Sequence, residues 1–293
     1  MKLLITGGSG FIGRNLLEYF STKGYKVIAP RHKELDLVEQ GCVNNYLTKN
    51  NIDFVIHCAV KPYHRAVKDT SGVLLANLLM FFNLAENQDK YKKMIFLGSG
   101  SAYNVEKYQP MMPEEYLGKF IPTDQGGLSK YITSKYIEKS DKIYDLRVFG
   151  IFGKYEDYSI RFISNLICKA IFDLPLTMSQ NRRFHYVDVA DFCKIIETFL
   201  EKDFKYQSYN ITPDKSIELL NLAKKIKEIS GKNLPISVKD KGLGIEYTGD
   251  NARLRSEIPQ FKFTPIERSI ENLFSYYKKN RSKIDKELLL EDK

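Results

Sequence analysis

Short apolar runs alternate with amphipathic segments through the first half of the chain. The run from Leu3 to Ile5 predicts a buried strand, and beyond a cluster of glycines the segment 11–23 has the apolar spacing of a helix that Gly24 ends. The same alternation predicts strands at 25–29, 53–58, 93–97 and 142–149, and helices at 39–49, 71–87 and from about Asp124 onward. Strands that alternate with helices favour right-handed crossovers, so we predict a doubly wound parallel α/β sheet.

Composition is that of an ordinary globular protein of 293 residues. No apolar run reaches the length of about 18 residues that crosses a membrane, and the chain starts directly with a strand, so we expect a cytoplasmic protein without a membrane partner. The scattered cysteines, without a Cys-x-x-Cys pair, predict reduced thiols and no metal site: Cys42, Cys58, Cys168 and Cys193. The net charge of +9 is spread among interleaved acids, which favours a solvated lysine-rich surface over nucleic-acid binding.

The glycines after the first strand have the spacing Gly-x-x-Gly-x-x-Gly, at Gly7, Gly10 and Gly13. Gly7 allows a tight turn, Gly10 lets the backbone approach a pyrophosphate, and Gly13 lets the helix pack closely on the strand. The backbone N–H groups that follow, at Phe11 and Ile12, would face the phosphates at the positive end of the helix dipole. This stretch predicts a dinucleotide-binding turn.

Arg31 decides which dinucleotide we expect. A carboxylate near the end of the second strand would accept hydrogen bonds from the adenosine ribose of NAD, but the chain has Arg31, followed by Lys33, at this place. A guanidinium holds a 2′-phosphate through charge-assisted hydrogen bonds, so NADP is favoured and NAD is less favoured. The alternative is that Arg31 is a solvated turn residue. After the third strand, the small residues Cys58, Ala59 and Val60 would let the cofactor lie across the strand ends.

A serine, a tyrosine and a lysine predict the chemistry. Ser99 follows the fourth strand, and Tyr131 and Lys135 lie one helical turn apart on the helix that begins near Asp124. An ammonium beside a phenol favours the phenolate, so Lys135 would tune Tyr131 while Ser99 binds a substrate oxygen. The pattern Tyr-x-x-x-Lys also occurs at 19–23 and 103–107, but only Tyr131 comes from a separate helix after a strand-end serine.

Together with the glycine turn, these residues resemble the Ser-Tyr-Lys triad of the extended short-chain dehydrogenase/reductases that act on nucleotide sugars, also called the NAD-dependent epimerase/dehydratase family. The segments 146–153 and 182–190 continue the resemblance, which covers essentially residues 1–279. It implies a Rossmann NADP-binding domain at 1–150, a smaller C-terminal α/β substrate lobe at 151–279 with some segments returning to the sheet, and a charged tail at 280–293. It also implies that Asp36, with Leu37 beside it, meets the adenine, that Lys135 holds the nicotinamide ribose, and that the protein is a homodimer.

The residues beside the triad narrow the reaction. A dehydratase of this family has an Asp-Glu pair where this chain has Gly100 and Ser101. The chain is most similar to the GDP-fucose synthase type, whose epimerising Cys is replaced by Ser101 and whose His is missing between 150 and 173. A serine hydroxyl is too weak an acid for proton exchange at C3 or C5, so we expect plain NADPH-dependent reduction of a 4-keto sugar in the synthesis of surface polysaccharide precursors. A C4 epimerase that retains NAD, and a non-catalytic NADP-binding sensor or scaffold, are the alternatives.

The anionic end of a nucleotide-diphosphate sugar would need cationic side chains. Guanidinium groups suit phosphate oxygens, and the resemblance implies a diphosphate-binding arginine in segment 182–190. The candidates for substrate binding, beside Ser99 and Ser101, are Lys154, Arg161 and Arg183, with Arg182 in reserve. For each of them a solvated surface position is the alternative.

Overall fold

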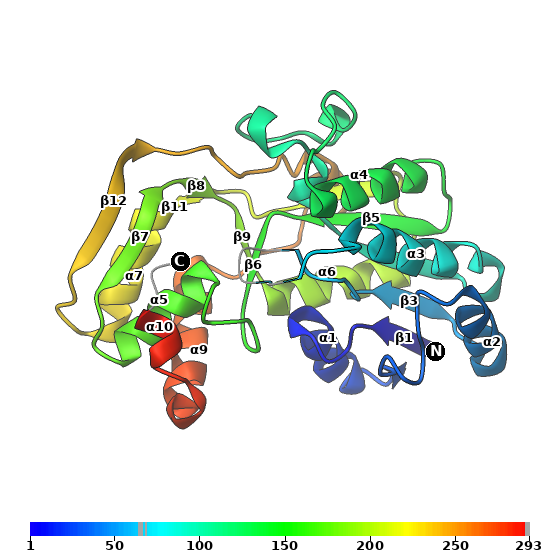
Figure 1. Ribbon diagram of the computed structural model, residues 1–293, viewed down its shortest axis with the longest axis horizontal. Helices are drawn as coiled ribbons and strands as arrows, with labels where there is room; N and C mark the ends of the chain where they lie inside the picture. The colour runs from blue at the N-terminus through cyan, green and yellow to red at the C-terminus, as the bar shows by residue number, and fades with distance from the viewer. Residues whose placement is uncertain (64–66, 68, 291–293) are drawn as a thin grey trace.

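A parallel sheet forms the centre of the first lobe in the computed structural model, which describes residues 1–63, 67 and 69–290 (Figure 1). The strand order is β10-β5-β4-β3-β1-β2, and every neighbouring pair is parallel. Its strands are β1 (Lys2–Thr6), β2 (Lys26–Ile28), β3 (Phe54–His57), β4 (Lys93–Ser99), β5 (Ile143–Val148) and β10 (Ser208–Ile211). The doubly wound parallel sheet predicted from the sequence is confirmed.

The alternation of side chains along each strand builds two separate apolar layers. Leu3 and Ile5 of β1 belong to the cluster that α1 (Phe11–Ser21) and α6 (Val189–Glu201) cover. Leu4, between them, belongs to the cluster on the opposite face. Since both faces of the strands are covered by helices, the strands are apolar at nearly every position. The helices of that opposite face are α2 (Gln40–Asn50), α3 (Val73–Ala85) and α4 (Gln125–Ile137).

The chain reverses its direction of winding at β1. From β1 it moves to β2 on one side, and from β2 it crosses over to β3 on the other side of β1. In open α/β sheets a crevice forms at the carboxyl ends of the strands at such a point, and ligands bind there. The fold therefore places the end of β1, the end of β3 and the glycine turn around one crevice.

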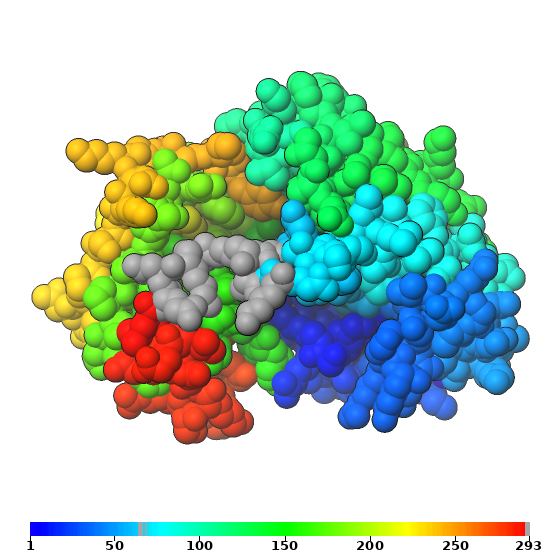
Figure 2. Space-filling view, in the orientation of Figure 1, coloured from blue at the N-terminus to red at the C-terminus, as the bar shows by residue number. Residues whose placement is uncertain are grey.

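A second apolar cluster forms the core of the C-terminal lobe, whose yellow to red segments lie opposite the blue and cyan N-terminal segments in Figure 2. Its strand pairs are β7 (Leu176–Asn181) with β12 (Ile236–Leu243), β8 (Arg183–Phe184) with β11 (Ile217–Glu218), and β6 (Gly150–Phe152) with β9 (Tyr186–Asp188). The remaining helices are α5 (Phe162–Ile171), α7 (Leu219–Ser230), α8 (Ala252–Glu257), α9 (Ile266–Lys279) and α10 (Glu287–Leu290), with short 3₁₀ turns at 88–90, 100–102, 105–107, 114–116 and 281–283.

Two features of the lobes qualify the expected domain boundaries. Helix α6 and strand β10 return from the second half of the chain to the first sheet. The described part of the expected charged tail, residues 280–290, packs on the second lobe through Ile284 and Leu289, which are buried in its core. Most of the other residues from 280 to 290 are exposed. No helix of the described residues is long and apolar enough to cross a membrane.

Candidate active site

The glycine turn forms a cradle that leaves no room for side chains. Gly7 has a φ of +68°, and a Cβ there would lie 2.8 Å from the backbone nitrogen of Ala59. A Cβ at Gly13 would collide with the carbonyl oxygen of Gly7. The N-cap of α1 is Gly10, and no side chain caps it. The first N–H groups of the helix thus lack a side-chain acceptor, which is the arrangement that receives a pyrophosphate.

The carboxyl end of β3 is fixed against this turn by Thr6. The backbone N–H groups of Cys58 and Ala59 each donate to the Thr6 hydroxyl at 3.2 Å. The Thr6 hydroxyl also lies 2.8 Å from Nδ1 of His57, whose burial lowers its pKa to about 3. His57 is therefore a neutral residue of the core. Its neighbours Cys58 and Val60 line a cavity of about 600 Å³ together with Phe11 and Ile12 of α1.

The residues expected at the adenosine end lie on the loop after β2. Arg31 is exposed, and within the described part of the chain its guanidinium has no ion-pair partner, because the carboxylate of Glu34 accepts the backbone N–H of Arg31 instead. One oxygen of Asp36 accepts the N–H of Val38, and Leu37 is buried. Arg31 is thus available to a phosphate, and the contacts of Asp36 and Leu37 with an adenine stay predictions.

Ser99 lies at the far end of the same cavity, as the last residue of β4. Its hydroxyl accepts the backbone N–H of Ser101 at 3.1 Å, and both serines line the cavity. The 3₁₀ turn at 100–102 follows β4 directly, and Ser99 is its N-cap. The cavity therefore extends from the glycine cradle to a hydroxyl that can donate to a substrate oxygen.

Helix α4 presents a different pair of positions to this cavity than the sequence predicted. Gly126, Ser129 and Lys130 line it, whereas Tyr131 and Lys135 do not. Tyr131 lies five positions after Gly126, and Lys135 lies five positions after Lys130. In a helix of 3.6 residues per turn, five positions correspond to a rotation of about 140° around the axis. Tyr131 Oη and Lys135 Nζ lie 4.0 and 3.9 Å from the place of a Cβ on Gly118, and Lys135 pairs with Glu138. Of the three predicted catalytic residues, Ser99 lines this cavity, and Tyr131 and Lys135 are not among its lining residues.

The small residues of α4 explain this rotation. A helix packs most closely on a sheet where its side chains are small, and the buried side of α4 consists of Gly127, Ser129, Thr133, Ser134 and Ile137. Lys130 lies within this arc, and Tyr131 and Lys135 lie outside it. This arc is visible in the sequence and would have placed Lys130 on the side of the helix that lines the cavity.

Lys130 holds its ammonium group at the end of β4. Nζ donates to the carbonyl oxygen of Leu97 at 2.6 Å and lies 4.3 Å from the centre of the Phe96 ring. Burial lowers the pKa of Lys130 to about 8, and the nearby carboxylate of Asp145 opposes this shift. Lys130 is thus a cation that borders the cavity, and its ammonium lies beside Leu97, two residues before Ser99 on β4.

Gly126 stands one turn before Lys130, where a side chain would point into the cavity. A Cβ at this position would lie 3.1 Å from Cδ1 of Tyr63, on the loop after β3. Among the described residues, the phenols that do line the cavity belong to Tyr63, Tyr186 and Tyr247. Tyr247 interacts with the hydroxyl of Ser99. The sequence pattern did not indicate Tyr247, because it lies in an irregular segment far from every motif.

A second cavity, of about 620 Å³, continues from the first. The two share Ile160, Phe162, Phe184 and Tyr186. Arg161 lines the first cavity, as does the buried carboxyl group of Glu156, whose pKa burial raises to about 8. Arg182 lines the second cavity. Together the two cavities form one cleft with a guanidinium in each part.

Two of the expected substrate-binding residues lie outside this cleft. Successive side chains of β8 point to opposite sides, so Phe184 faces the cleft whereas Arg183 faces away and pairs with Glu218 at 2.9 Å. Lys154 pairs with Glu18 of α1. The guanidinium groups that line the cleft are those of Arg161 and Arg182.

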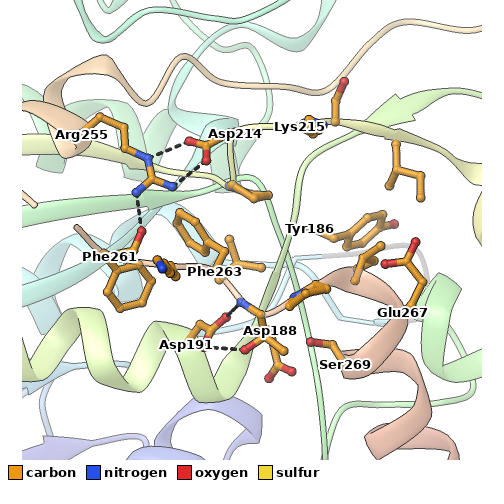
Figure 3. A pocket seen from close by; sticks show the side chains of 18 of the residues that line it. Tyr186, Asp188, Asp191, Asp214, Lys215, Arg255, Phe261, Phe263, Glu267 and Ser269 are labelled. Atoms are coloured by element: carbon orange, nitrogen blue, oxygen red, sulfur yellow. Dashed lines mark hydrogen bonds and ion pairs between the residues drawn. The ribbon is translucent and has the colours of Figure 1, made fainter. Parts of the chain in front are cut away.

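Another hollow, of about 890 Å³, lies between the start of α6, the loop before β11 and the loop before α9 (Figure 3). Two of its charged side chains bind other groups of the protein: Arg255 pairs with Asp214 at 2.7 Å, and Asp191 accepts the backbone N–H of Thr264. None of the expected cofactor or substrate residues lines it. In the described ranges, no group of three or more His, Cys, Asp or Glu side chains is placed to hold a metal ion.

Comparisons with known proteins agree with this geometry. The model of the "NAD dependent epimerase/dehydratase family" matches residues 3–212. GDP-L-colitose synthase of Yersinia pseudotuberculosis is 26% identical over 94% of this chain and 98% of that protein. GDP-L-fucose synthase of Azorhizobium caulinodans is 32% identical over 48% of this chain and 47% of its own length.

A solved structure of similar fold is the GDP-mannoheptose C4 reductase of Campylobacter jejuni with NADP bound. It superimposes with a TM-score of 0.83 at 18% identity, over 94% of this chain and 98% of that one. The glycine cradle, the crevice at β1 and the serine at the end of β4 are thus features of a chain that belongs to the NAD dependent epimerase/dehydratase family, enzymes of the extended short-chain dehydrogenase/reductase class.

Proposed function

We propose that this enzyme reduces the 4-keto group of a nucleotide-linked sugar with NADPH. The observation that supports this most strongly is the cleft made by two adjoining cavities: the first is lined by Phe11 and Ile12 after the glycine turn, by Ser99, Lys130 and Arg161, and the second by Arg182. A dinucleotide fits the first part and an anionic sugar nucleotide the second. Relatives named as GDP-L-colitose synthase and dTDP-4-dehydro-6-deoxyglucose reductase support this substrate class.

Arg31 supports NADPH as the cofactor. The exposed guanidinium can bind a 2′-phosphate, and no carboxylate of the loop competes for its charge in the described residues, since Glu34 binds backbone N–H instead. Similar structures named as NADP complexes include the C4 reductase and the dTDP-4-dehydrorhamnose reductase of Bacillus anthracis. NADPH, when bound, supplies the hydride that reduces the sugar carbonyl.

The chain's own residues hold the carbonyl and its developing charge. The Ser99 hydroxyl donates to the carbonyl oxygen, and the ammonium of Lys130 lowers the energy of negative charge at the end of β4. We assign to Lys130 the ribose-binding role expected of Lys135, because Lys130 borders the cavity. Ser101 lines the cavity where an epimerising enzyme of this type has a thiol, and its hydroxyl is too weak an acid for proton exchange at carbon.

The test is to incubate the purified enzyme with NADPH and an NDP-4-keto-6-deoxy sugar. We expect one NADPH to be oxidised for each sugar reduced. A sugar that changes configuration at C4 without net change in cofactor absorbance would instead establish an epimerase. A matched variant, Ser99→Ala, should lose about a hundredfold or more in kcat while it still binds NADPH.

A further inference from the structure

A reduction that ends in an alcohol needs a proton donor beside Ser99, and α4 provides no phenol to this cavity. The position of α4 that faces the cavity one turn before Lys130 is Gly126, which has no side chain. Tyr131 lies on another side of the helix. If the proposed function holds, on which this inference rests, the acid must come from another segment.

Three phenols line the cavity among the described residues, and their surroundings differ. Tyr63 is 43% exposed and lies beside Gly126. Tyr186 stacks on Phe184 at 5.5 Å between ring centres. The hydroxyl of Tyr247 lies 2.8 Å from the place of a Cβ on Gly100, the residue after Ser99, and the Ser99 hydroxyl is near enough to lower the pKa of this phenol. A general acid must reach the same oxygen as the serine that polarises it, so geometry favours Tyr247.

Tyr247 is held rigidly at this place. Its backbone N–H donates to the carbonyl of Arg183 at 2.8 Å. Its ring packs on Phe149 and Tyr108, at 5.0 and 5.1 Å between centres. Its hydroxyl lies 2.8 Å from the place of a Cβ on Gly100, the residue after Ser99, so the close approach of this phenol requires glycine there.

The charges around Tyr247 suit a proton donor. Burial raises the pKa of Tyr247, so the phenol is protonated at neutral pH and able to donate. The nearby hydroxyls of Ser99 and Tyr108, and the positive charge of Arg161, lower the pKa of Tyr247 and so oppose that rise. The phenol therefore starts neutral and forms its anion among three groups that stabilise it.

We propose that Tyr247 is the catalytic acid of this enzyme and donates its phenolic proton to the oxygen at C4. As hydride adds to C4, the π electron pair of the carbonyl moves to oxygen, which takes the proton and becomes a hydroxyl. The Tyr247 phenolate then takes a proton from water. The sum is one ketone, one NADPH and one proton converted to one alcohol and one NADP⁺.

The experiment compares Tyr247→Phe with Tyr63→Phe and Tyr186→Phe, which remove the other two phenols. We expect Tyr247→Phe to lose about a hundredfold or more in turnover, and each of the other two variants to lose at least tenfold less than Tyr247→Phe. The matched control is Tyr131→Phe, whose phenol does not line the cavity and which should stay within about threefold of the unsubstituted enzyme. NADPH affinity, measured by fluorescence titration, should stay within about threefold in Tyr247→Phe and Tyr131→Phe, since we assign neither phenol to cofactor binding.

Binding supplies a readout that does not depend on turnover. GDP-L-fucose carries a 4-hydroxyl, and calorimetry without cofactor should show it binding about two- to tenfold more weakly to Tyr247→Phe than to Tyr63→Phe. Full turnover in Tyr247→Phe, a loss of turnover in Tyr63→Phe as large as in Tyr247→Phe, or loss of NADPH binding in Tyr247→Phe would overturn the assignment of Tyr247. Failure of the unsubstituted enzyme to oxidise NADPH with any NDP-4-keto sugar would overturn the proposed function itself.

Discussion

The cavity side and the outer side of helix α4 have the same spacing of residues and different surroundings. On the cavity side Lys130 stands one turn after Gly126, with its ammonium against the carbonyl of Leu97. On the outer side Lys135 stands one turn after Tyr131 and pairs with Glu138. The outer pair, Tyr131 and Lys135, has the phenol and the ammonium that the reaction needs. The pair on the cavity side, Gly126 and Lys130, lies where a side chain can reach the substrate. Position determines function because a proton or a hydrogen bond must reach the substrate.

The comparison also shows why a cavity without a helical phenol can remain an active site. The serine, the lysine and the glycine cradle each come from a different strand or helix, and the sheet holds all three in place. A phenol is needed near Ser99, but its ring can come from any segment that packs there. The segment around Tyr247 does so through Phe149 and Tyr108.

Substituting the two lysines gives the largest expected difference between the two sides. Lys130→Met should lower kcat/KM by about a hundredfold or more, because the cation beside the cofactor and the developing oxyanion is lost. Lys135→Met should stay within about threefold. Steady-state NADPH oxidation measures both, with circular dichroism as the check of folding. The reverse ranking would return the active site to the outer side.

The cofactor end of the cleft offers the next largest effect. Arg31→Ala should reduce the preference for NADPH over NADH by about ten- to a hundredfold, since charged hydrogen bonds contribute about 1.5–3 kcal/mol each. The kinetics with NADH serve as the internal control and should not change. An unaltered preference would show that Arg31 is a solvated turn residue.

The two adjacent arginines of the second lobe form a matched pair. Arg182→Ala should raise KM for the nucleotide sugar by about five- to tenfold, because Arg182 lines the cleft. Arg183→Ala should leave KM unchanged, because its partner is Glu218. Equal effects of the two substitutions on KM would contradict the alternation of side chains in β8.

The pH dependence of cofactor binding tests Lys130 without a substitution, and its expected effect is the smallest. Its pKa of about 8 means that the ammonium loses its proton, and with it the attraction for cofactor, as pH rises through 8. NADPH affinity should therefore fall by roughly fivefold between pH 7 and 9. In Lys130→Arg the cation persists and this pH step should disappear; a step of the same size in that variant would assign the titration to another group.

Much of this architecture follows from local patterns. The apolar runs predicted the strands of the first sheet, and the glycine spacing predicted the cradle, because both depend on residues close in sequence. Local patterns do not determine which side of α4 lines the cavity, or whether Arg182 or Arg183 lines the cleft. Both depend on how each segment packs against parts of the chain that are distant in sequence. Tyr247 depends on a contact between segments more than a hundred residues apart, which no spacing encodes.

Tyr131→Phe tests most directly which side of α4 is the active one. The substitution removes the phenol of the outer side and keeps its ring, which packs in the cluster around Tyr103 and Leu117. The account predicts kcat and kcat/KM for NADPH-dependent reduction within about twofold of the unsubstituted enzyme. A loss of about a hundredfold in kcat with unchanged NADPH binding would contradict it and show that Tyr131 is the catalytic acid.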